Sequence, residues 1–189
     1  MLSLRTPLRP ASLVAAIASA SVIAGCGSSS SSSGVSAGAY VKSVCNAVAP
    51  FEKDIVSRSN ALDATTLSNA AEGKKALQGF LTAVSADTQT ALTQLKNAGK
   101  PNVKNGKQIS AAIVGAFSQL NGAMSQALSQ ADALPTSSPQ AFKTAAQALS
   151  TNIRSSMANI GTSLQSSTLK SQELQQAAAK EPACKNLGA

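Results

Sequence analysis

The 189-residue chain contains no histidine and no tryptophan, and only 3% of its residues are aromatic. Without histidine it cannot form the Ser-His-Asp or Cys-His arrangements that activate many nucleophiles, and it lacks the most common metal ligand. Its eight carboxylates follow no metal-binding spacing. We therefore predict that the protein is not an enzyme and has no catalytic residues, metal ligands or cofactor.

Acidic residues are also scarce: the chain contains eight aspartates and glutamates but 16 lysines and arginines. The excess positive charge comes mostly from lysines scattered among serine, glutamine and alanine. Nucleic-acid-binding surfaces usually combine arginine-rich patches with stacking aromatic rings. The sequence therefore predicts no nucleic-acid partner.

Residues 1–25 have the layout of a lipoprotein signal peptide. Arg5 and Arg9 form a basic lead, and residues 11–23 are uncharged and mostly apolar. This apolar stretch is shorter than the roughly 20 residues that a membrane-spanning helix needs. We therefore expect a cleaved export signal rather than a stable span.

The apolar stretch runs into Val22-Ile23-Ala24-Gly25-Cys26. This string resembles the lipobox of bacterial lipoproteins, with Ile23 where leucine is most common. The resemblance implies cleavage before Cys26, attachment of diacylglycerol to its sulfur, and often acylation of the new N-terminus by a fatty acid such as palmitate. It also implies a cell-membrane location on the extracytoplasmic face. The alternative is an ordinary cleaved signal followed by an unrelated cysteine.

Residues 26–37 read as a lipidated cysteine and a tether, because Gly27, six consecutive serines and Gly34 follow Cys26. Such a composition stays a solvated, flexible coil, and ten residues of it span about 17 Å on average. The folded domain is then expected at residues 38–189, close to the membrane.

Apolar residues in this domain recur at spacings of three and four, and no alternation of period two is sustained. Four such stripes predict an all-α fold, an antiparallel up-down-up-down four-helix bundle with a short C-terminal helix near residues 169–180. The alternative is a pair of long hairpins that bury their stripes only with a partner. The stripes are Tyr40, Val44, Val48, Phe51 and Ile55; Leu77, Phe80, Leu81, Val84, Ala91, Leu92 and Leu95; Ile109, Ile113, Phe117, Leu120, Met124, Leu128 and Ala131; and Phe142, Ala146, Leu149, Ile153, Met157, Ile160 and Leu164.

Residues that favour the start or the end of a helix support these expected helix boundaries. Gly99 and Pro101 predict the end of the second helix, and Ser138 followed by Pro139 predicts the start of the fourth. Asn69 has capping-box spacing to Glu72 near the start of the second helix. Pro50 lies inside the first stripe and is expected to kink or split that helix.

Cys45 and Cys184 remain as an even pair once Cys26 carries lipid, and export places them in an oxidising compartment. In an up-down bundle the start of the first helix and the chain end lie at the same end. A disulfide between them would close a loop of about 140 residues and stabilise the fold by roughly 5 kcal/mol, as an upper figure. The alternatives are two free thiols or a redox pair.

Four lysines, Lys96, Lys100, Lys104 and Lys107, surround the Gly99/Pro101 break without an intervening acid. Helix direction places this turn at the same end of the bundle as Cys26, where eight lysines and two glutamates give a net charge of +6. Lysines beside an anionic membrane gain up to about 1 kcal/mol each. We therefore expect an anionic membrane contact; the alternative is that these charges serve solubility alone.

In layout and composition the chain resembles small helical lipoproteins of high-GC Gram-positive bacteria whose function is unassigned. The resemblance implies a non-catalytic interaction or structural module of the cell envelope, with an anionic lipid or an envelope protein as partner. The alternative function is a carrier that holds an apolar ligand or lipid within the bundle. A large apolar cavity would favour the carrier, and a filled bundle with an exposed patch would favour a protein partner.

The first prediction concerns the anchor. Mass spectrometry of the mature N-terminus should find diacylglyceryl-Cys26, because the basic lead, the short apolar segment and the lipobox all precede a serine tether. A mature chain that starts at another residue, or retains Met1, would contradict lipidation at this position.

Overall fold

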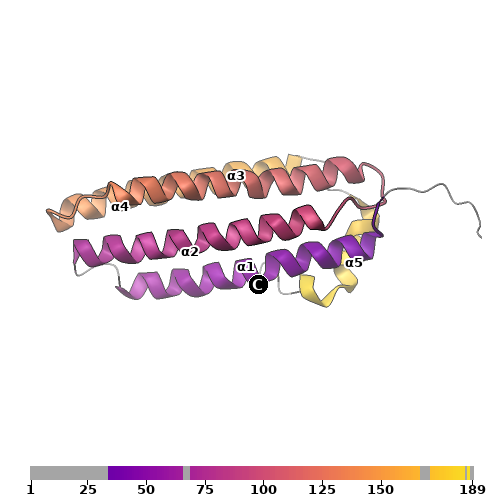
Figure 1. Cartoon of the computed structure of the whole chain (residues 1–189), viewed down its shortest axis with the longest axis horizontal. Helices are drawn as coiled ribbons and strands as arrows, with labels where there is room; N and C mark the ends of the chain where they lie inside the picture. The colour runs from indigo at the N-terminus through magenta and orange to yellow at the C-terminus, as the bar shows by residue number, and fades with distance from the viewer. Residues whose placement is uncertain (1–33, 66–68, 167–170, 186, 188–189) are drawn as a thin grey trace, which may run out of the picture. The chain divides into compact units, whose positions relative to one another are not determined.

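The structure is a computed structural model that describes residues 34–65, 69–166, 171–185 and 187. Its elements are α1 (Ala37–Thr65), α2 (Ala70–Asn97), α3 (Gly106–Asp132), α4 (Pro139–Ser166), α5 (Gln172–Lys180) and a 3₁₀ turn, η1 (Pro182–Cys184) (Figure 1). Among these described helices, none combines the length and apolarity needed to cross a bilayer. The signal peptide, Cys26 and the serine run lie outside the described residues.

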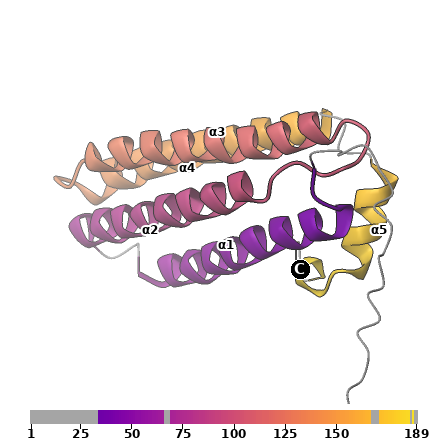
Figure 2. The ribbon, with the colours of Figure 1, turned by 45° about the vertical axis from the view of Figure 1, so that its right-hand side comes forward.

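The four long helices pack sequentially antiparallel, and the predicted all-α fold with a short C-terminal helix is confirmed. Helix α2 packs against both α1 and α3, and α4 packs mainly against α3 (Figure 2). Within the described residues, α1 and α4 make at most a marginal contact with each other. The α1–α2 hairpin therefore packs on the α3–α4 hairpin mainly through α2 and α3. Among the described residues, α1 and α4 pack little against each other.

Side-chain hydrogen bonds cap α2 and α4 at the starts predicted for them. The Asn69 side chain caps α2 by accepting a hydrogen bond from the amide of Ala71 at 2.9 Å. The Ser138 hydroxyl accepts one from the amide of Ala141 at 3.2 Å, at the start of α4. Pro50 lies within α1, which remains one continuous helix, so the expected split does not occur.

The apolar residues form two clusters along the bundle. The larger cluster joins all four long helices and includes the buried side chains of Leu81, Leu120, Met124 and Leu149. The second gathers at the end where α1 begins, and its buried members are Tyr40, Val41, Cys45, Ala98, Ile109 and Leu174. Among the residues whose burial the structure describes, the largest fully buried side chains are Leu81, Leu95, Ile109 and Thr88, so this part of the core contains few large residues. Helices of this kind depend on small residues that allow close approach and on additional cross-links.

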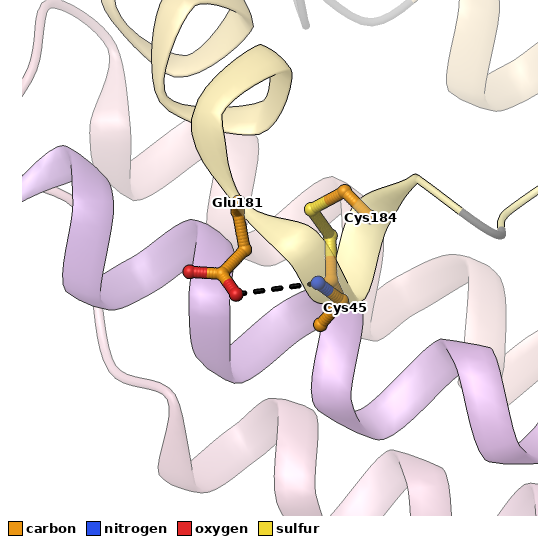
Figure 3. The surroundings of a disulfide bond; sticks show 4 residues. Cys45, Glu181 and Cys184 are labelled. Atoms are coloured by element: carbon orange, nitrogen blue, oxygen red, sulfur yellow. Dashed lines mark hydrogen bonds between the residues drawn. A yellow bond between two sulfur atoms is a disulfide. The ribbon is translucent and has the colours of Figure 1, made fainter.

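One such cross-link is the disulfide between Cys45 in α1 and Cys184 in η1, which confirms the predicted pairing (Figure 3). The two cysteines are 139 positions apart in sequence. The Glu181 carboxylate accepts a hydrogen bond from the amide of Ala183 and so caps the turn that carries Cys184. Helix α5 and η1 pack on α1, and the disulfide fixes them there.

The second prediction concerns this bond. Replacing both Cys45 and Cys184 with serine should lower the free energy of unfolding by about 2–5 kcal/mol, because the bond closes most of the domain's length. Thermal and denaturant unfolding would measure the loss. Non-reducing peptide mapping of the wild-type protein should recover the linked peptides; full alkylation of both thiols without reductant would contradict the disulfide.

Candidate membrane-facing site

The first described residues of the chain are attached to the turn between α2 and α3. The amide of Val35 donates a hydrogen bond to the carbonyl of Lys100 at 2.8 Å, and the amide of Asn102 donates one to the carbonyl of Val35 at 2.7 Å. These bonds form an isolated parallel bridge between Val35 and Pro101. The polypeptide therefore enters the bundle beside the turn that carries the predicted lysines.

The turn itself has a defined backbone. Gly99 adopts a positive φ of 76°, which glycine accepts without steric cost, and its carbonyl accepts a 2.8 Å hydrogen bond from the Ser110 hydroxyl. Asn105 also has a positive φ, 61°, a conformation that asparagine tolerates better than most residues. A Cβ on Gly106 would lie 1.9 Å from the backbone carbonyl oxygen of Pro101. Only glycine fits here, so the turn folds tightly against the start of α3.

The four predicted lysines are brought together by this turn and are all exposed. Lys96 lies in the last turn of α2, Lys100 and Lys104 lie in the connection, and Lys107 lies in the first turn of α3. We call this set the basic pole. Among the described residues none of the four has an ion-pair partner, and neither α1 nor α3 has an acidic residue in its first turn. Their positive charge is therefore not neutralised locally.

The helix dipoles act on Lys96 and Lys107 in opposite ways. Lys96 sits at the negative end of α2, where a cation is favourable, but Lys107 sits at the positive end of α3, where it is unfavourable by a few tenths of a kcal/mol to about 1 kcal/mol. Helix stability therefore does not explain Lys107. Three further exposed lysines, Lys42, Lys180 and Lys185, lie on the neighbouring elements α1, α5 and the residue after η1. Lys170, the eighth lysine assigned to this end, lies outside the described residues.

Two hollows lie beside the basic pole. An open groove of about 510 Å³ separates the start of α1 from α5 and is lined by charged residues of both signs, Lys42, Lys180, Glu173 and Glu181 among them. A smaller pocket of about 230 Å³ lies between α1, α3 and α5, and its lining is almost entirely apolar. Ligand pockets commonly measure about 300–1,000 Å³. The smaller pocket is thus too small to enclose a whole drug-sized molecule.

Sequence reasoning missed one polar cluster, which joins Asp54 and Arg58 of α1 to Asp87 of α2. The Arg58 Nε donates to Asp54 and lies 3.8 Å from Asp87 Oδ2. The hydrogen bond from Arg58 lowers the pKa of Asp54, whereas burial and the neighbouring Asp54 carboxyl raise the pKa of Asp87. The four-residue spacing of Asp54 and Arg58 signalled their pair, but Asp87 joins only through the α1–α2 register.

Among the described residues, no group of three potential metal ligands from histidine, cysteine, aspartate and glutamate occurs. Comparison with protein-family models, curated proteins and solved structures finds no match to this chain. No relative therefore supplies site residues, and the interpretation of the basic pole depends on its own geometry.

The third prediction tests the turn that builds the basic pole. Gly106→Ala should destabilise the protein by roughly 1–3 kcal/mol, because the new methyl group collides with backbone rather than with a movable side chain. Gly115→Ala is the matched control in the same helix, since nothing lies within 4 Å of its added Cβ. That control should stabilise the protein by about 0.5–1 kcal/mol. Equal effects of the two substitutions on the melting temperature would contradict the turn geometry.

Proposed function

We propose that the protein is a lipid-anchored, non-catalytic interaction module of the bacterial cell envelope, held with its basic pole against the anionic membrane surface. The observation that carries this proposal is the bridge between Val35 and Pro101. It attaches the start of the described chain to the lysine-bearing turn. The lipobox supplies the anchor, and the absence of histidine together with the scarcity of carboxylates supports a role without catalysis.

The distances favour this orientation. Cys26 lies eight positions before Gly34, and a flexible chain of that length spans about 16 Å on average and at most about 28 Å. By contrast, the 28 residues of α2 place the opposite end of the bundle about 42 Å further along the helix. Membrane charge is screened over about 8 Å at physiological ionic strength. With the bundle upright on its tether, the basic pole is therefore the end that lies nearest to the field of the membrane.

The expected energy suits an anchored protein. At up to about 1 kcal/mol for each lysine, the four lysines supply at most about 4 kcal/mol, which corresponds to a dissociation constant near 1 mM. Such an interaction is weak for a protein that must bind from solution. For a domain already held by lipid, it is enough to select one orientation over others.

The fourth prediction follows from this estimate. A chain that starts at residue 27, and so lacks the lipidated cysteine, should bind vesicles rich in phosphatidylglycerol weakly, and added salt should release it. Replacing Lys96, Lys100, Lys104 and Lys107 with glutamine should abolish the binding. Vesicle co-sedimentation at several salt concentrations would measure both effects.

The control removes the same amount of charge elsewhere. Lys53, Lys75, Lys143 and Arg154 are all exposed and lie outside the basic pole. Lys74 is unsuitable as a control because its ammonium donates to the carbonyls of Asp132 and Leu134. Replacing the control set with glutamine should leave most of the vesicle binding intact. Equal losses from the two sets would show that net charge, rather than a placed basic pole, causes the binding.

A further inference from the structure

The apolar pocket beside the basic pole is lined by three elements that are distant in sequence. It measures about 230 Å³ and is open to solvent on one side. Its walls come from the first turns of α1, the first turns of α3 and the middle of α5. The lining residues are Tyr40, Val41, Val44, Cys45, Ile109, Ile113, Leu174, Gln175 and Ala178.

The mostly apolar lining of the pocket favours the binding of hydrocarbon groups. Only Tyr40 and Gln175 bring polar side-chain groups, and Tyr40 is only 3% exposed. No charged side chain lines the pocket. A polar or charged ligand group placed inside would lose its water without gaining a partner, which is costly. The portion of a ligand that enters this pocket must therefore be apolar.

The size of the pocket limits how much of a ligand can enter. At about 230 Å³ it exceeds the roughly 150 Å³ of an engineered apolar cavity that binds benzene. It is smaller than the roughly 300–1,000 Å³ typical of sites for whole ligands. A segment of one hydrocarbon chain fits these limits, whereas two chains side by side or a bulky headgroup do not.

The position of the pocket indicates the source of such a chain. Tyr40 and Ile109 lie in the first turns of α1 and α3, at the end where the described chain begins eight residues after Cys26. Under the proposed function this end lies near the bilayer, and the exposed lysines at the same end favour a ligand whose headgroup is negative and stays outside. The nearest source of hydrocarbon chains is then the bilayer itself, and the size of the pocket restricts the ligand to the single-chain lipids within it.

We propose that the pocket between α1, α3 and α5 binds one hydrocarbon chain of a single-chain anionic lipid, of the fatty-acid class, drawn from the membrane. The choice of a membrane lipid rests on the proposed function, whereas the preference for hydrocarbon rests on the pocket lining alone. Helix α5 forms one wall, and the Cys45–Cys184 disulfide holds the adjoining η1 against α1. The site is therefore built by the chain's end folding back on its beginning.

The experiment uses the lipid-anchored protein reconstituted into vesicles that contain palmitic acid with a photoactivatable diazirine at the end of its chain. After illumination, peptide mapping should place the label within residues 40–45, 109–113 and 174–178. Ile113→Trp should lower this labelling by about tenfold, because filling the pocket excludes the methylene groups whose burial drives binding. Val44→Trp fills the pocket from the α1 wall and should have the same effect.

Val56→Trp is the matched control, because Val56 is 52% exposed and does not line the pocket. It should leave the labelling unchanged, and a cooperative thermal unfolding transition in each variant would show that the fold is retained. Labelling that spreads to Val56 and Met157, or that survives both pocket-filling substitutions, would overturn the pocket proposal. If the pocket is not labelled while the lysine-dependent vesicle binding persists, the lipid site is wrong and the proposed membrane orientation stands.

Discussion

The Cys45–Cys184 disulfide is the constraint on which one end of this molecule depends. Helix α5 and η1 pack on α1 and have no comparable contact with the other described helices. Few large side chains are fully buried, so noncovalent packing alone holds this C-terminal segment weakly. The disulfide fixes the segment over Tyr40, Val41 and Ile109, and it thereby completes the second apolar cluster.

At the same end of the bundle, the segment before α1 is held by hydrogen bonds rather than by a covalent bond. Val35 pairs with the turn between α2 and α3, and Gly106 allows that turn to close against α3. Both described ends of the chain thus converge on the lysine-bearing end of the bundle. An anchor attached shortly before Val35 would hold this turn close to the membrane. The attachment point and the lysines would then lie at the same end of the bundle. The apolar pocket exists at this end because α5, rather than a fourth long helix, forms its third wall.

Much of the fold was predictable because it depends on local signals. The spacing of the apolar residues specified the helices, and Gly99 with Pro101 specified the turn that gathers the lysines. Cysteine number and bundle direction predicted the disulfide. A kink or a split was expected at Pro50, and the split does not occur. The proline removes one helical hydrogen bond, but Phe51 and Ile55 still pack against the larger cluster, and the Phe51 ring lies 5.6 Å from that of Phe117.

Other features were not predictable from patterns. The Val35–Pro101 bridge involves two residues without a distinctive motif, and its formation requires the folded turn. The approach of Asp87 to Asp54 and Arg58 depends on the register between α1 and α2, which apolar periodicity does not specify. The pocket depends on where the nine-residue helix α5 packs. The sequence of α5 does not indicate that α5 packs against α1. Lipidation of Cys26 stays a prediction, since that residue lies outside the described part of the chain.

The central claim is that the lysine-bearing end of the bundle faces the membrane. A fluorophore attached at position 104 or at position 75 of the lipid-anchored protein, in vesicles whose anionic lipids carry a headgroup quencher, measures this orientation directly. If the lysine-bearing end faces the membrane, quenching is strong at position 104 and weak at position 75, and high salt reduces the difference. Equal quenching at the two positions at low salt would show that the domain has no preferred orientation, and would contradict the claim.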